Sequence, residues 1–183
     1  MTVATTDRHH ESTALLGMTL FLASWAMLLA ALLFAYGVVR VRATVWPPAD
    51  LPHLPLGLPF FGTVFLAQAS LAMQRARRNP DRAAGPLLFA WLASAGFFAV
   101  QVLVWTRLWE RGLRLDTGPY GSVFFGLTGF HGLHVLVGLG GLLSLIVSAA
   151  RGRLEPIPLR LWTLFIHMVS IFWMLVFVSL YLL

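Results

Sequence analysis

The stretch TGPYGSVFFGLTGFHGLHVLVGLGGLLSLIVSAA, residues 117–150, runs for 34 residues without a charged side chain. A helix needs about 20 mainly apolar residues to cross the hydrocarbon core of a bilayer, which is about 30 Å thick. A charge buried in that core costs at least about 2.5–3.5 kcal/mol, so a charge-free run of this length indicates a membrane helix. We predict that this helix covers residues 120–150, after the turn Thr117-Gly118-Pro119-Tyr120.

Four more charge-free segments lie on either side of this stretch, namely Ser12–Val39, Leu51–Gln74, Ala83–Thr106 and Leu161–Leu183. The apolar residues in them do not alternate with a period of two, which favours helices over the strands of a membrane barrel. Prolines are tolerated in the first turn of a helix, so Pro59 places the start of the second helix nearby. The sequence therefore predicts an all-α integral membrane bundle of five transmembrane helices, at about residues 14–39, 57–75, 86–107, 120–150 and 161–183.

The composition excludes several classes of protein. Hydrophobic residues make up 58% of the chain and charged residues 11%, whereas soluble domains carry about 25% charged residues. The absence of cysteine excludes disulfides, thiolate nucleophiles and iron–sulfur clusters. The basic residues are scattered along the chain, so nucleic acid is not a predicted partner. We predict one membrane domain over residues 1–183, with residues 1–13 as a short N-terminal segment.

The arginines predict the orientation of the bundle. Of the 13 arginines, eight fall on the side of the N-terminus and five on the opposite side. By the positive-inside rule, the N-terminus lies inside and the C-terminus outside. Four arginines follow the second helix and are candidates for contacts with anionic lipid head groups, because each basic residue near such a surface contributes about 1 kcal/mol. They are Arg75, Arg77, Arg78 and Arg82.

A few polar side chains lie inside the predicted spans. The candidate polar cluster consists of Ser24, Thr128, His131, His134, His167 and Ser170. His131 and His134 are three residues apart and share one helix face. His134 and His167 fall at similar predicted depths on neighbouring helices, which predicts a hydrogen bond between them.

Three interpretations of the histidines are open. The first is metal or haem ligation by His134 and His167, although the spans contain no carboxylate to help bind a divalent metal. The second is a proton relay, which lacks the usual acidic partners. The third, which we favour, is interhelical hydrogen bonding that fixes the packing, at about 0.6–2 kcal/mol per bond.

Helix 120–150 is also rich in glycine. Small residues spaced four apart, such as Thr128 and Gly132, let helix backbones approach closely. We therefore predict that this helix is a central packing element contacted on more than one side.

Several segments of the sequence match the pattern of a known family. Residues 120–125 read YGSVFF, residues 128–135 read TGFHGLHV, and residues 17–24 read GMTLFLAS. The segment Trp46-Pro47-Pro48 and the last helix, with His167, Phe172-Trp173 and Val178-Ser179-Leu180-Tyr181, complete the pattern. From about Leu15 to Tyr181, the chain resembles subunit III of haem-copper terminal oxidases in the five-helix bacterial form.

The resemblance implies a non-catalytic accessory subunit of a respiratory oxidase in the bacterial cytoplasmic (inner) membrane. Such a subunit packs laterally on catalytic subunit I, with subunit II in the same complex. It binds phospholipid and supports stability and proton uptake during oxygen reduction. Haem and copper are then expected in the catalytic subunit, and the resemblance assigns no catalytic residue, metal ligand or cofactor to this chain.

Two residues depart from the family pattern. Trp25 stands where members commonly have glutamate, and Ser170 stands where they commonly have aspartate. Any role that rests on an ionisable carboxylate in the membrane is therefore not expected for this chain.

Alternatives to this assignment stay open. One is the related accessory protein of nitric-oxide reductase systems. Another is a stand-alone small transporter or channel, for which the second and third helices offer little polar lining beyond Gln68, Ser94 and Gln101. A third is a b-type haem protein that uses His134 and His167. The sequence does not indicate whether the electron donor of an oxidase partner is cytochrome c or quinol.

Overall fold

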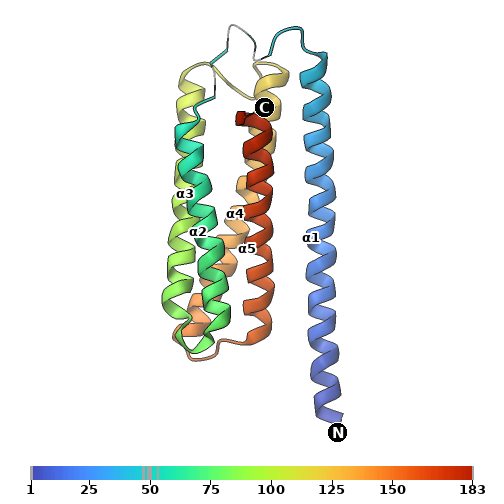
Figure 1. The fold of residues 1–183 in the computed structure, drawn as a ribbon, viewed down its shortest axis with the longest axis vertical. Coiled ribbons are helices and arrows are strands. Elements are labelled where there is room, and N and C mark those ends of the chain that lie inside the picture. The colour runs from blue at the N-terminus through green and yellow to red at the C-terminus, as the bar shows by residue number, and fades with distance from the viewer. Residues whose placement is uncertain (1, 47, 49–50, 53, 183) are drawn as a thin grey trace.

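The computed structural model describes residues 2–46, 48, 51–52 and 54–182, which form helices and connecting turns (Figure 1). The helices are α1 (Thr2–Arg42), α2 (Gly57–Arg78), the 3-10 helix η1 (Pro80–Arg82), α3 (Ala84–Glu110), α4 (Pro119–Ala150), α5 (Pro156–Phe177) and the π-helical η2 (Val178–Leu182). The predicted all-α bundle of five long helices is confirmed. Among the described residues, α1, α3, α4 and the α5–η2 segment are long and apolar enough to cross a membrane.

The fifth helix, α2, is shorter and ends in three arginines. Its 22 residues span about 33 Å, and it packs between α3 and α5. That α2 also crosses the bilayer, and that the N-terminus lies inside, stay predictions.

The first helix begins earlier than its charge-free segment predicts. It starts at Thr2 and so includes most of the predicted N-terminal segment 1–13. The physical reason is the local sequence, since no glycine or proline interrupts the chain before Gly17. Two positions of the sequence analysis, Pro47 in the family pattern and Leu183 at the end of the last helix, lie outside the described residues.

The turn before α4 forms as predicted. Gly118 has φ 110°, a conformation that L side chains rarely adopt, and Pro119 is the first residue of the helix. The N–H that proline lacks would be unpaired in the first turn in any case. Gly118 and Pro119 therefore set the point at which α4 begins.

Helices α2 to α5 surround a common core, and α1 stands at its edge (Figure 1). Large fully buried side chains fill the core, among them Phe97, Phe124 and Trp173. Trp173 lies edge-on to Phe97, with the ring centroids 4.7 Å apart. Pairs of this geometry contribute about 0.5–1.5 kcal/mol beyond the area that they bury.

Helix α1 is joined to the bundle near both ends. Near its N-terminal end, Arg160 of α5 donates a 2.9 Å hydrogen bond to Glu11. Near its C-terminal end, the Tyr36 hydroxyl donates a 2.8 Å hydrogen bond to the carbonyl oxygen of Ser179, and Arg40 donates to the same hydroxyl at 3.0 Å. The order of these contacts shows that α1 and α5 run parallel.

Helix α4 is contacted on two sides, by α3 and by α5, which confirms that part of the prediction. At Gly132 a Cβ atom would lie 3.1 Å from the ring of Trp105 on α3. At Gly141 a Cβ atom would overlap the ring of Trp162 on α5. An indole from a neighbouring helix therefore occupies the space of a side chain at Gly141 and leaves little space for one at Gly132.

Candidate functional site

Polar residues inside the bundle form interhelical contacts of the kind that the sequence predicted, the first of them between α3 and α4. On α4, the Thr128 hydroxyl accepts a 3.0 Å hydrogen bond from Nε1 of Trp105 on α3. The same hydroxyl donates to the carbonyl oxygen of Phe124 at 2.7 Å. Thr128 is completely buried, so this bond satisfies an indole N–H that would otherwise lie in an apolar interior.

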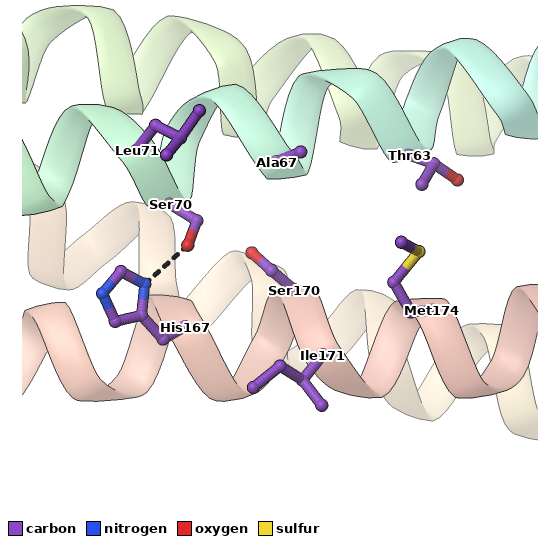
Figure 2. Close-up of a pocket in the computed structure, with 8 residues that line it drawn as sticks. All are labelled: Thr63, Ala67, Ser70, Leu71, His167, Ser170, Ile171 and Met174. Atoms are coloured by element: carbon purple, nitrogen blue, oxygen red, sulfur yellow. Dashed lines mark hydrogen bonds between the residues drawn. The ribbon is translucent and has the colours of Figure 1, made fainter.

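The second contact joins α5 to α2 and is drawn in Figure 2. Nδ1 of His167 and the Ser70 hydroxyl are 2.5 Å apart. One turn further along α5, the Ser170 hydroxyl lies 3.1 Å from the carbonyl oxygen of Leu66 and 2.9 Å from that of Ile166. His167 and Ser170 therefore hold α5 against α2.

The expected hydrogen bond between His134 and His167 is not formed. Nδ1 of His134 lies 2.8 Å from the carbonyl oxygen of Phe130 on its own helix, whereas His167 bonds to Ser70. The prediction matched the two residues by depth alone. Depth does not say toward which neighbour a residue faces, and the histidines face different helices.

His134 instead contacts α1 through its ring. The indole of Trp25 lies parallel to the imidazole, with the centroids 3.8 Å apart and the planes inclined by 6°. Trp25 also contacts Phe172 of α5, at 4.7 Å between centroids. His134 therefore contributes to packing through stacking, while its bond to Phe130 stays within α4.

His131 differs from the other histidines of the predicted cluster. Its side chain is 1% exposed, and neither ring nitrogen has a hydrogen-bond partner among the described residues. Its ring lies against Phe97 and Trp173. The favoured interpretation, interhelical hydrogen bonding by the histidines, is therefore wrong for His131, and it is also wrong for His134, whose bond stays within α4.

Ser24 stands apart from the other residues of the predicted cluster. It is exposed on α1 and donates to the carbonyl oxygen of Phe21, three residues earlier in the same helix. It therefore does not join the polar residues of the interior.

The structure adds partners that the sequence analysis did not single out, Ser70 for His167 and Thr63 for Trp173. Nε1 of Trp173 donates to the Thr63 hydroxyl at 2.9 Å. Both partners lie on α2, the least apolar of the long helices, where a hydroxyl side chain is less unusual than in the other spans. Their polarity within the charge-free segment 51–74 was the available signal.

A groove of about 550 Å³ runs between α2 and α5 (Figure 2). Its walls are mainly apolar and include Ala67, Leu71, Ile171 and Met174. The Ser70–His167 pair contributes polar atoms to the wall of the groove. A groove of this size and polarity can accept a flexible apolar chain.

The four predicted lipid-contact arginines, Arg75, Arg77, Arg78 and Arg82, lie at the C-terminal end of α2 and in η1. All four are exposed, and the structure gives none of them an ion-pair partner among the residues that it describes. The arginines therefore lie at the end of the bundle, beyond the groove.

Comparison with known proteins decides the family. The model of the family "Cytochrome c oxidase subunit III" matches residues 4–183. A cytochrome c oxidase subunit 3 of Synechocystis sp. is 33% identical, over 95% of this chain and 77% of the relative. A probable cytochrome c oxidase subunit 3 of Nocardia farcinica is 30% identical, over 90% of this chain and 85% of the relative. The chain belongs to the cytochrome c oxidase subunit III family.

Within this family, the two departures in the pattern acquire structural reasons. Trp25, where the resemblance led us to expect glutamate, fills the space between α1 and α4 with a stacked ring. Ser170, where the resemblance led us to expect aspartate, lies against two carbonyl oxygens. A hydroxyl can donate to a carbonyl, whereas an ionised carboxylate only accepts. The surroundings of residue 170 therefore suit a neutral donor.

Proposed function

We propose that this member of the subunit III family is a non-catalytic accessory subunit of a bacterial haem-copper respiratory oxidase. In this proposal it packs laterally on catalytic subunit I, in a complex that also contains subunit II, in the cytoplasmic membrane. The observation that carries the proposal is the family match over residues 4–183. Haem and copper belong to the catalytic subunit, which performs the oxygen reduction.

The packing of the polar residues supports an accessory role. Trp105, Trp173 and His167 direct their ring nitrogens to hydroxyls on neighbouring helices. Side chains engaged in this way hold helices together at fixed positions. We infer that this chain acts as a rigid body that supports its partner in the membrane.

Bound phospholipid is the second part of the proposal. The charge of Arg77 and Arg78 suits a lipid phosphate, and the groove between α2 and α5 suits an acyl chain. Seven residues separate Ser70 from Arg77, which places the groove and the arginine about 10 Å apart along the helix. One lipid can therefore reach both, with its head group on the arginines and one chain in the groove.

Support of proton uptake is the third part. Because Trp25 and Ser170 replace the common membrane acids, this chain offers no carboxylate at either position. We infer that this chain supports proton uptake by stabilising its partner subunit and by binding lipid.

Purification through this chain in mild detergent tests the proposal. We expect a large subunit that contains haem and copper to co-purify in stoichiometric amount. A tagged multi-span protein of another family, taken from the same membrane, provides the control. Recovery of the chain without the large subunit, under conditions that preserve oxidase activity in the membrane, would contradict the assignment. A haem spectrum stoichiometric with the isolated chain would instead support the b-type haem alternative.

A further inference from the structure

Three polar side chains in the core of the bundle have atoms without a hydrogen-bond partner among the described residues. The atoms are both ring nitrogens of His131 on α4, the amide nitrogen of Gln101 on α3 and the hydroxyl of Tyr181 on η2. Exposed fractions of 1%, 1% and 8% show that bulk solvent does not reach these side chains. Nε1 of Trp25 is also unpaired, but it belongs to the stacked contact between α1 and α4.

His131 and Tyr181 both lie against Trp173, and Gln101 lies on the same face of α3 as Phe97. The ring of Trp173 lies 5.2 Å from that of His131 and 6.5 Å from that of Tyr181, between centroids. Gln101 follows Phe97 by one turn of α3, and Phe97 lies 5.6 Å from His131. The amide nitrogen of Gln101 and the hydroxyl of Tyr181 both lack a hydrogen-bond partner among the described residues.

Other side chains near these residues do not supply the missing bonds. Nε1 of Trp173 is already bonded to Thr63, and Nε1 of Trp105 is bonded to Thr128. The rings of Phe97 and Phe124 carry no polar atom. His131 and Tyr181 therefore lie in an aromatic enclosure, and their polar atoms and the amide nitrogen of Gln101 lack a hydrogen-bond partner among the described residues.

The end of the last helix supports a special role for Tyr181. Residues Val178–Leu182 form a π-helix, whose wider turn changes the direction of the side chains that it carries. Short π-helical turns are rare and are often found at functional sites. Here the turn carries Tyr181, whose ring lies against those of Trp173 and Phe124.

We propose that His131, Gln101 and Tyr181 bind ordered water inside the bundle, at least one molecule that links α3, α4 and the η2 end of the last helix. Buried polar groups that lack a protein partner are commonly satisfied by ordered water with two to four bonds. The chemistry is complementary, since a neutral imidazole offers one donor and one acceptor, the amide nitrogen donates, and the phenol does both. One water can accept from Gln101 and donate to the unprotonated nitrogen of His131.

A structure of the chain in the assembly from which it is isolated, at a resolution that shows ordered water, tests this site. We expect a water peak within about 3.2 Å of a ring nitrogen of His131 and of a polar atom of Gln101 or Tyr181. A direct bond between two of the side chains without a peak, a lipid chain in this place, or an empty and well-resolved site would each overturn the proposal.

Variants separate bound water from ordinary packing. His131→Leu should abolish the peak. Ser94→Ala provides the matched control and should keep it, because Ser94 is equally buried on α3 but bonds to Ala90 of its own helix. A peak that survives in His131→Leu would contradict the assignment of His131.

A double-mutant cycle covers the case in which His131→Leu does not assemble. Gln101→Leu and Tyr181→Phe each remove one partner of the water and leave the aromatic enclosure in place. If both partners bind the same water, the loss of thermal stability in the double variant is smaller than the sum of the two single losses. Strictly additive losses would contradict a shared site.

Discussion

The indole of Trp25 lies flat on the imidazole of His134, with ring centroids 3.8 Å apart and planes inclined by 6°. This contact joins α1 to α4 in the middle of the bundle, between the two terminal attachments of α1 to the last helix. Because lipid tails are as apolar as the side chains, burial alone does not drive α1 onto the bundle. Shape and stacking at Trp25 therefore contribute to the attachment of α1, together with the polar contacts near its two ends.

Removal of the indole should loosen α1. We expect Trp25→Ala to destabilise the bundle by about 3 kcal/mol, by analogy with large-to-small substitutions in packed cores. Trp25→Phe should destabilise the bundle less than Trp25→Ala, because a smaller ring can still stack on His134. Thermal unfolding in detergent measures the effect. Met27→Ala is the control, since Met27 is 75% exposed on the same helix. Equal losses in Trp25→Ala and Met27→Ala would show that the stacked pair does not hold α1.

Two adjacent glycines of α4 should respond oppositely to the same change. Gly141→Ala places a Cβ atom against the ring of Trp162, and we expect a loss of about 1–3 kcal/mol from overpacking. Gly140→Ala meets no atom within 4 Å and should be neutral or stabilising, because alanine favours the helix by up to about 1 kcal/mol. Denaturant titration of both variants checks this. A tolerated Gly141→Ala would mean that α4 and α5 are not in close contact at this point.

The bond between Trp105 and Thr128 should contribute measurably to stability. Thr128→Val keeps the shape of the side chain but leaves the indole N–H unpaired, and we expect a loss of about 0.6–2 kcal/mol. Thr106→Val serves as the control, because Thr106 is exposed and bonds to Leu103 of its own helix. Thermal unfolding of the two variants compares them. If they are equally stable, the interhelical bond contributes nothing net.

The arginines at the end of α2 should select anionic lipid. Replacement of Arg77 and Arg78 by glutamine should weaken the binding of an anionic phospholipid by about 2 kcal/mol, or about thirtyfold, at about 1 kcal/mol for each arginine. Neutral phospholipid should be unaffected. Arg111→Gln, at the opposite end of the bundle, provides the control. Displacement of a labelled anionic lipid from the purified assembly gives the measurement, and an equal effect of Arg111→Gln would argue against a specific site.

In an assembled oxidase, His131→Ala should shorten the time for which the enzyme stays active and leave the initial rate of oxygen reduction unchanged. We expect an initial rate of oxygen reduction close to that of the wild type, followed by faster loss of activity during turnover. The reason is that His131 lies in the core of this chain, where it contacts Phe97 and Trp173. Leu133→Ala, on the exposed side of α4, is the control. Immediate and total loss of activity in an intact complex would point to a direct chemical role for His131.

Much of the fold could be predicted because the bilayer restricts which residues a membrane-spanning segment can contain. Charged residues are excluded from the hydrocarbon core, so the charge-free segments alone mark the five long helices. The start of α4 followed from Gly118 and Pro119, which restrict the backbone locally. The start of α1 was predicted less well, because a helix that continues beyond the membrane carries no compositional signal at its end.

The site was predicted less completely than the fold. The sequence identified Thr128, His167 and Ser170 as polar residues in the membrane, and all three bond to neighbouring groups in the interior. It could not say that His167 would bond to Ser70 or that Ser24 would face outward. A difference of one residue rotates a side chain by about 100° around a helix, and the sequence does not indicate the angle at which each helix faces its neighbours.

The sequence by itself determined the membrane class, the number and approximate limits of the long helices, and the resemblance that the comparisons confirmed, because these depend on composition and on local order along the chain. Only the tertiary structure decided that Trp25 stacks on His134, that His167 bonds to Ser70, and that His131 and Tyr181 both lie against Trp173. These contacts depend on the rotation and separation of helices that are distant in sequence, and close packing of whole side chains fixes both.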